Sequence, residues 1–501
     1  MRGALLICLP ALASAAWADG APPSGLVIQT RLALETLLTD NNRLTDTNRD
    51  TALVTTVSPG ISIAARGARL FGTLDYSLSG IAYAKSAEPD RIQQSLRAVG
   101  SAELIENLLK VDTAASISQQ SASALGPQTL DNSLANPNRT EVATLMVAPR
   151  LNGRIGSFAS VQVTGSVTET RTKDNAAGDT RQTGGSVAVN SLGSGQFGWY
   201  ANLTDQRMSY LQYSGQSDSA QAWVGLSYRP DVDVSLSLNG GRERSNYLAG
   251  TPETSAIFGG SFGWTPSPRT KVTGDWMRHS YGNSHTLAIE YRLARSAFRY
   301  IDNQGVNQTP QLGATSLGSV YDVLFLQYAS IEPDPVKRDQ LVRSYLSGTG
   351  INPNTQLVGQ VLTNTPVLSR QQQLSYSISG VRTSLVLSAQ RSFTDRIGSP
   401  TGVVGDLSNF QSVVQRGVSL TLSHQLTPIS SAGLSFSLIH NGGLGGSGLQ
   451  ASDAKLRMLT ANWSSRIAIR TSVGFMIRRT DSDGTYGYRE NAASVNLTQL
   501  F

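Results

Sequence analysis

Apolar and polar residues alternate with a period of two along most of the chain. Residues 232–239 and 467–478 show the pattern, and residues 418–426 show it most regularly. In that last segment the apolar members are Val418, Leu420, Leu422 and Leu426, with Ser419, Thr421, Ser423 and Gln425 between them. A period of two predicts strands whose two faces meet different surroundings. The chain is therefore predicted to be all-β.

The C-terminal segment ends the chain on the same pattern. Ala493, Val495, Leu497 and Phe501 share one face, which Gln499 interrupts. An apolar edge strand invites aggregation, whereas a closed barrel gives it a partner on both sides. The segment resembles the C-terminal strand of bacterial outer-membrane β-barrels, which the barrel assembly machinery recognises. Phe501, Leu497 and Val495 are therefore the expected assembly signal, and the final strand of a soluble β-protein is the alternative.

Short and long connections alternate between the predicted strands, with short turns such as residues 66–67, 380–382 and 464–465. Short periplasmic turns and long external loops are typical of outer-membrane barrels. The chain is thus predicted to be one transmembrane antiparallel β-barrel of about 22 strands, within a range of roughly 20 to 24. Aromatic residues beside the short turns predict an interfacial girdle: Phe197, Trp199, Tyr228, Trp264, Tyr291, Phe298 and Trp463.

Composition agrees with a membrane barrel. Charged residues make up 15% of the chain, against about 25% in soluble domains. From residue 26 onward no apolar run approaches the roughly 18 residues of a transmembrane helix, so a membrane would be crossed by strands. The net charge of +6 is small for 501 residues and argues against a nucleic-acid partner. Outer-membrane lipid and lipopolysaccharide are the expected surroundings.

Residues 1–18 have the features of a secretory signal peptide. Arg2 supplies the positive charge, residues 5–15 the apolar region, and residues 16–18 a small-x-small cleavage site. Cys8, the only cysteine, would leave with this segment, so no disulfide is expected. Residues 19–501 are then predicted to be the barrel, without an N-terminal plug domain.

Residues 303–364 form the longest predicted connection and contain helical signals. Ser319 can cap one helix, and Asp334-Pro335 can begin a second. The apolar sides of these helices would be Val320, Leu324 and Tyr328 in the first, and Leu341 and Tyr345 in the second. A barrel of about 22 strands encloses a lumen that must be filled. This long, partly helical loop is therefore the predicted plug, and an external cap over the mouth is the alternative.

The polar faces of the strands predict a lumen with mixed charges among Ser, Thr, Asn and Gln. The charged candidates for lining it are Lys271, Asp275, Glu290, Arg292, Arg470 and Arg478. Such a lining would pass or hold a hydrated, hydroxyl-rich solute.

No residue pattern predicts catalysis, a cofactor or a metal site. His279-Ser280, with His285 nearby, is interpreted as a solvated hairpin, although a Ser/His pair within hydrogen-bond distance on the outer face would favour an enzyme. Residues 481–484 begin like a calcium loop but no Glu follows at the twelfth position, so a turn is predicted.

Residues 53–70, 95–120 and 332–346 resemble a family of outer-membrane β-barrel proteins associated with PEP-CTERM and exosortase systems. The three segments read LVTTVSPGISIAARGARL, SLRAVGSAELIENLLKVDTAASISQQ and EPDPVKRDQLVRSYL. The resemblance covers most of the chain and implies a conduit or accessory in exopolysaccharide export, alongside polysaccharide-export components. It implies no catalytic residues. The alternatives are a structural or assembly barrel without a through-path, and a passive uptake porin.

Overall fold

The computed structural model describes residues 25–129, 131–173, 179–193, 195–211, 215–247, 250–307, 321, 325, 338, 342, 363–398, 403–445 and 453–501. Within them, 22 strands form one antiparallel sheet, which confirms the predicted barrel. The predicted signal peptide lies outside the described residues. The strands are β1 (Gly25–Thr39), β2 (Ala52–Arg66), β3 (Leu70–Ala84), β4 (Arg91–Ile105), β5 (Leu109–Ser121), β6 (Arg139–Ile155), β7 (Ala159–Thr172), β8 (Thr180–Ser191), β9 (Phe197–Tyr210), β10 (Gly215–Asp231), β11 (Val234–Ser245), β12 (Glu253–Ser267), β13 (Thr270–His279), β14 (Gly282–Arg292), β15 (Ser296–Asn307), β16 (Val367–Ser379), β17 (Thr383–Arg396), β18 (Ser412–Thr427), β19 (Ser430–Leu444), β20 (Asp453–Ala468), β21 (Thr471–Gly484) and β22 (Tyr488–Leu500).

The first and last strands close the barrel. β1 pairs with β2 on one side and with β22 on the other, from Arg31↔Leu500 to Thr39↔Ala492. Beyond that ladder, the Phe501 backbone N–H donates to the Thr30 carbonyl at 2.9 Å. In hydrocarbon every backbone polar group needs a partner within the protein, so the β1–β22 seam removes the edges that an open sheet would expose.

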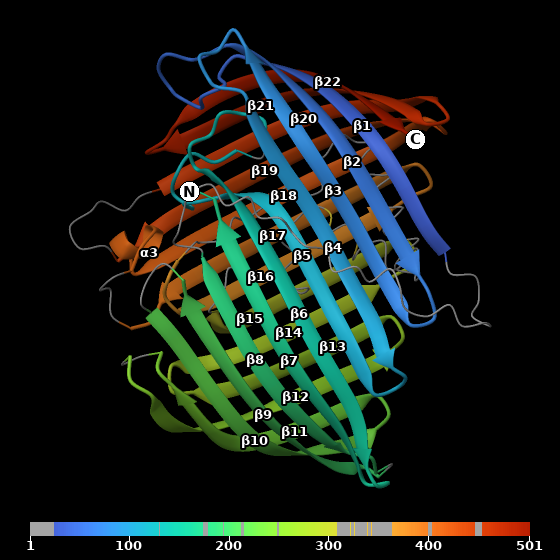
Figure 1. The fold of residues 1–501 in the computed structure, drawn as a ribbon, viewed down its shortest axis with the longest axis vertical. Coiled ribbons are helices and arrows are strands. Elements are labelled where there is room, and N and C mark those ends of the chain that lie inside the picture. The colour runs from blue at the N-terminus through green and yellow to red at the C-terminus, as the bar shows by residue number, and fades with distance from the viewer. Residues whose placement is uncertain are drawn as a thin grey trace.

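Short turns join the strands at one end of the barrel, and the long connections lie at the other end, where the β13–β14 and β21–β22 connections are also short. In Figure 1 the short turns follow the right-hand edge, and β1–β6 cross in front of the orange and red strands β17–β22. The alternation agrees with the prediction from the sequence. It places the start of β1 and the end of β22 at the short-turn end, which is the periplasmic end in barrels of this kind.

The outer wall is apolar and the inner wall is mainly polar. Leu32, Leu34 and Leu38 of β1 are 42–53% exposed, whereas Leu37 and Thr39 on the other face are buried. Rings of the predicted girdle are exposed on the outside near the short turns, and Phe197 stacks on Tyr228 at 4.8 Å. A closed barrel with an apolar exterior and an aromatic girdle is stable only across a bilayer. The protein is an outer-membrane β-barrel.

The helical plug predicted for residues 303–364 is not confirmed. Tyr321, Phe325, Arg338 and Val342 have helical backbones, but they are the only residues described between 308 and 362. The residues predicted to form the apolar sides, Val320, Leu324, Tyr328, Leu341 and Tyr345, lie outside the described residues. Among the described elements the one helix is α3 (Asp406–Asn409). No helix in the described part of the chain has the length and apolar composition to span a bilayer.

One predicted turn is misplaced. The sequence pattern puts a turn at residues 464–465 and a strand across 467–478, but β20 continues to Ala468 and the turn is Ile469-Arg470. Ile469 is 94% exposed at the tip of this turn. The apolar alternation runs on through the turn, because Ile467 and Ile469 keep the parity of the next strand. The pattern alone therefore gave the wrong strand end, and it misplaced Arg470.

Deleting Phe501 should lower the yield of assembled barrel, because the deletion removes a hydrogen bond of the seam and the exposed terminal ring. The measurement is the fraction of outer-membrane protein that migrates as the folded, heat-modifiable band. Phe501→Tyr, which keeps an aromatic ring, serves as the control and should assemble normally. Equal assembly of the deletion variant and the parent would contradict a role for the terminal residue.

Candidate functional site

The connection between β5 and β6, residues 122–138, folds into the barrel, and we call it the inner loop. Residue 130 lies outside the described residues, and the other residues of the inner loop contact elements that are distant along the chain. These contacts are with Asp406 of α3, Asn441 of β19, Arg478 of β21 and Tyr488 of β22. β5 and β19 are not neighbours in the sheet, so the inner loop reaches across the lumen near the long-loop end.

Arg478 ties the inner loop to the barrel wall. Its Nη1 lies 2.7 Å from Asp131 Oδ2 of the loop, and its Nη2 lies 2.7 Å from Glu490 Oε1 of β22. Thr39 and Thr480 donate their hydroxyls to the same Glu490 carboxylate, at 3.1 and 3.2 Å. The Arg478 and Glu490 side chains are 6% and 0% exposed. Removing one member of such a buried pair costs about 3–5 kcal/mol, because an unpaired charge remains in the interior.

The acidic member in the loop keeps its charge well into the acid range. Burial raises the pKa of the Asp131 carboxyl, but the charge of Arg478 and hydrogen bonds from Ser133 outweigh burial and hold the pKa below the ordinary value of 3.8. The ion pair is therefore formed at any pH that the outer membrane ordinarily meets.

Apolar packing and backbone hydrogen bonds fix the middle of the inner loop. Leu134 is fully buried in a cluster with residues of the inner wall, among them Leu37 and Ile81. Burial of one such side chain contributes about 1.5–3 kcal/mol. The Tyr83 hydroxyl donates to the Ser133 carbonyl at 2.6 Å, and the Tyr488 hydroxyl donates to the Gln128 carbonyl at 2.5 Å.

A second attachment holds the start of the inner loop. The Asp406 carboxylate accepts hydrogen bonds from the Ser123 hydroxyl at 2.5 Å and from the Ala124 N–H at 2.7 Å. The Asn441 side-chain amide donates to the Ala124 carbonyl at 2.7 Å. Burial raises the pKa of Asp406, and its two hydrogen bonds offset only part of this effect. The two attachments therefore respond to acid in opposite directions.

The six residues predicted to line the lumen do not form one site. Lys271 faces Glu290 across the β13–β14 ladder near the short turns, where Arg292 and Arg299 lie 3.3 and 3.4 Å from the Glu290 carboxylate. Asp275 is on the same face of β13, opposite Thr286. Arg478 is at the other end of the barrel. Arg470 is in the β20–β21 turn and not on a strand face, so its prediction as a lining residue was wrong.

Sequence reasoning missed the partners of Arg478. Glu490 shares the polar face of the last strand with Ser494 and Asn496, so its parity was available as a signal. Asp131 gave no signal, because it lies in a loop and meets an arginine 347 residues away. The long loop around residues 121–140 is visible in the sequence, but its inward path is not.

The interpretation of His279 as solvated was wrong. The hairpin exists, with a two-residue turn between β13 and β14, but the His279 side chain is 5% exposed. It contacts Glu243 and Ser284 on the inner wall. His285 has the opposite parity and lies 3.3 Å from Asp302.

Residues 481–484 lie at the end of β21, where Asp481 pairs with Arg489 in the ladder with β22. In the described part of the chain, no group of three His, Cys, Asp or Glu side chains is placed to hold a metal ion.

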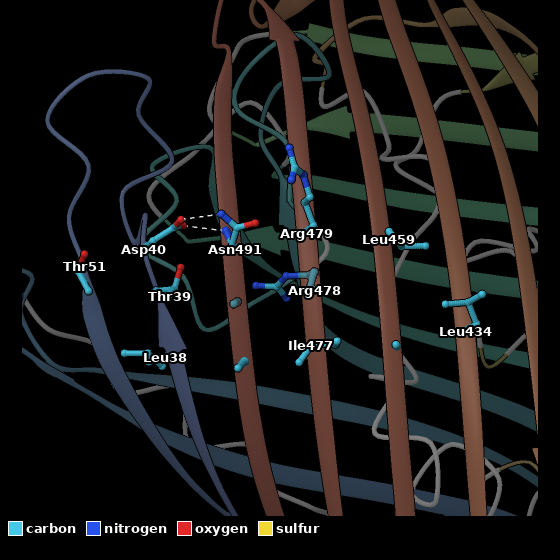
Figure 2. Close-up of a pocket in the computed structure, with 13 residues that line it drawn as sticks. Leu38, Thr39, Asp40, Thr51, Leu434, Leu459, Ile477, Arg478, Arg479 and Asn491 are labelled. Atoms are coloured by element: carbon cyan, nitrogen blue, oxygen red, sulfur yellow. Dashed lines mark hydrogen bonds between the residues drawn. The ribbon is translucent and has the colours of Figure 1, made fainter.

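A groove on the outer wall crosses the seam, and it is not a polar site. Figure 2 shows Asp40 after β1 joined to Asn491 of β22 by two hydrogen bonds, of 2.7 and 2.8 Å. The apolar part of its lining consists of residues with outward parity, among them Leu38, Leu434, Leu459, Ala461, Ile477 and Ala493. Their outward parity places the groove against lipid.

Comparison with known proteins shows likeness in shape only. No protein-family model matches the chain, and no curated protein is similar to it. Among solved structures, the FrpB iron transporter from Neisseria meningitidis (F5-1 variant, apoprotein form) has a TM-score of 0.49 and 11% identity, covering 94% of this chain and 81% of that chain. The siderophore receptor PirA from Pseudomonas aeruginosa has a TM-score of 0.44 and 10% identity, covering 94% and 80%.

Arg478→Ala should release the inner loop and raise single-channel conductance in planar bilayers several-fold. The variant leaves Asp131 and Glu490 as buried carboxylates without their counter-charge, a cost of about 3–5 kcal/mol that an outward loop would relieve. The matched control is Arg479→Ala, since Arg479 is the next residue of β21 and lies on the outer wall. Equal conductance of both variants and the parent would contradict this account.

Acid should leave the inner loop in place between pH 7 and about pH 4 and release it below that. The Asp131 pKa is lowered in the folded protein, so its stabilisation is complete above the ordinary value of 3.8 and is lost as pH falls through the folded value. The pKa of Asp406 is raised, so protonation of its buried carboxyl stabilises the attachment at Ser123 and Ala124 as pH falls. Conductance measured from pH 7 to pH 3 should be flat and then rise, and a rise already complete at pH 5 would contradict the assignment.

Proposed function

We propose that the protein is a gated outer-membrane conduit for a hydrated, hydroxyl-rich solute, with the inner loop as the gate. One observation supports this above all: a loop is held across a polar lumen by two separate attachments, Arg478–Asp131 and Asp406 with Ser123 and Ala124. A purely structural barrel has no need of a loop that an ion pair and hydrogen bonds hold across its lumen. A gate needs contacts that are strong when formed and separable as a unit.

The lining of the inner wall fits such a solute. Neighbouring strands bring hydroxyls together in pairs across the inner face, including Ser388 with Ser419 at 2.7 Å and Ser431 with Ser464 at 3.0 Å, of which Ser419 and Ser431 are partly exposed to the lumen. Hydroxyl and amide groups offer weak, repeated hydrogen bonds to sugar-like hydroxyls. Passage requires such contacts, because tight binding at one place would stop a moving chain.

An exopolysaccharide is the solute that the resemblance to PEP-CTERM and exosortase-associated barrels suggests. On this proposal the protein acts with polysaccharide-export components, and the barrel assembly machinery inserts it. The Lys271, Glu290, Arg292 and Arg299 cluster would then meet the polymer first from the periplasmic end, where mixed charges tolerate both neutral and acidic units.

A second candidate is a receptor for import of a bound solute. The observation that favours it is the strand number, because 22-stranded outer-membrane transporters have a plugged lumen. One of the similar structures is an iron transporter and the other is a siderophore receptor. On this reading the inner loop would close the lumen from the outside until a ligand binds.

Loss of the gene should leave polysaccharide in the periplasm while its synthesis continues. The measurement is the amount of periplasmic and secreted polysaccharide in the deletion strain, with the parent gene and the Arg478→Ala gene returned on a plasmid. Normal secretion without the gene would exclude the export proposal. Normal secretion together with slower growth on chelated iron would favour the receptor.

A further inference from the structure

We propose that Ser284, His279 and Glu243 form a hydrolytic site on the lumen wall, which cleaves an O-acyl ester of a hydroxyl-rich solute. The three side chains come from β14, β13 and β11. His279 Nδ1 lies 2.9 Å from Glu243 Oε2, and His279 Nε2 lies 2.9 Å from Ser284 Oγ. A nucleophile, a base and an acid that orients the base define the serine-hydrolase arrangement, which is recognised by geometry on unrelated folds.

The strand register explains how the three residues meet. β13 ends at His279, and after the two-residue turn β14 begins at Gly282, so Ser284 is the second inward position of β14. Glu243 of β11 pairs with Ser255 of β12, one strand away from β13. The Glu243 side chain therefore passes over β12 to reach the imidazole.

The exposure of the three side chains rises from the acid to the base to the nucleophile, which leaves the nucleophile accessible to a substrate. The Glu243 side chain is 0% exposed and that of His279 is 5%, whereas Ser284 is half-buried at the lumen surface. The Tyr281 ring lies over the imidazole at 4.7 Å with an interplanar angle of 10°. Tyr247 packs edge-on against Tyr281 at 5.9 Å. The acid and base are thus shielded, and the hydroxyl is the member that a solute can reach.

The hydrogen bonds fix which way the protons point. A glutamate oxygen can only accept, so His279 donates its Nδ1–H to Glu243 and its Nε2 is left as an acceptor. The Ser284 hydroxyl then donates to Nε2. An imidazole protonated at Nδ1 and unprotonated at Nε2 is the tautomer that can remove a proton from serine. Gln221 contacts the other Glu243 oxygen at 3.4 Å and helps to hold the carboxylate.

Space for an acyl group lies beside Ser284. His285 pairs with Gln304 of β15, so Gly305 is the residue across from Ser284, and a Cβ added to Gly305 would meet no atom of the described residues within 4 Å. Asn303 has the same parity, and its side-chain oxygen accepts from Thr286 at 3.2 Å. On this proposal its amide N–H groups donate to the developing oxyanion.

The reaction is an ordinary ester hydrolysis with water as the second substrate. Ser284 Oγ bonds to the ester carbonyl carbon while its proton moves to His279 Nε2. The carbon–oxygen bond to the alcohol breaks, and the leaving oxygen takes that proton, which gives a free hydroxyl and an acyl-serine. Water then gives a proton to His279 and bonds to the acyl carbon; the bond to Oγ breaks, and the proton returns to Ser284 as a carboxylic acid is released.

The substrate class rests on the proposed function, whereas the triad does not. The site faces the lumen and not the lipid, which disfavours acyl chains of membrane lipids as substrates. A solute with many hydroxyls is the kind of molecule that bears O-acyl groups, and passage along the wall would bring each ester past Ser284.

The direct test is labelling of the purified, folded barrel with a fluorophosphonate probe, in which a serine oxygen replaces fluoride on phosphorus. The parent protein should be labelled at Ser284, and Ser284→Ala should abolish labelling. Ser280→Ala is the matched control, because Ser280 is the exposed serine of the same hairpin and should leave labelling unchanged. Folding of each variant is checked by heat-modifiable migration.

Hydrolysis of p-nitrophenyl acetate gives the second readout. Glu243 acts through His279 and is a positioning residue, so Glu243→Gln should lower kcat of the folded fraction by about 10³- to 10⁴-fold with KM unchanged. A purely structural Glu243 would lower the folded yield and leave kcat alone. Labelling of folded parent protein at no serine, or equally in Ser284→Ala, would overturn the proposal. Conductance recorded on the same samples should not change, so failure here is separable from failure of the gated conduit.

Discussion

The structure depends on the requirement that every backbone polar group within a bilayer find its partner in the protein. Twenty-two strands meet this requirement only as a closed sheet, and the β1–β22 ladder closes it. Closure at this strand number has a consequence, because the lumen is too wide for the wall's own side chains to fill. The inner loop responds to that constraint, since it brings Leu134 and its neighbours into the space that the wall leaves.

Two kinds of interaction hold the inner loop, and they differ in how they can be released. Apolar burial around Leu134 is insensitive to charge and resists gradual withdrawal. The Arg478 network is all-or-none, because any partial separation leaves a buried charge unpaired. Together they favour a loop that is fully in or fully out, which is the behaviour of a two-state gate.

The sequence predicts the fold much better than it predicts the site. Period-two alternation, alternating connection lengths and Phe501 are local signals. The residues of each strand alone therefore predict its direction and which of its side chains face inward. Glu490 and Arg478 could be placed on the inner face in this way. Their partner Asp131 could not, because a loop residue has no parity and its path depends on packing far along the chain.

The contact between Glu243 and His279 could not be predicted either, since it joins strands that are not neighbours in the sheet. The prediction that Arg470 lines the lumen was wrong for a different reason. The alternation of apolar residues continues through the β20–β21 turn as it does through a strand.

We infer that movement of the inner loop controls passage through the lumen, and a reversible cross-link can test this inference. Cysteines in place of Ser123 and Asp406, whose side chains now touch at 2.5 Å, can lock the loop to α3 in a chain whose sole native cysteine, Cys8, is replaced. Passage of a neutral oligosaccharide into liposomes is then measured before and after reduction. Oxidation should block passage, and reduction should restore it to the level of the single-cysteine variants. Equal passage through the oxidised and reduced barrels would contradict it.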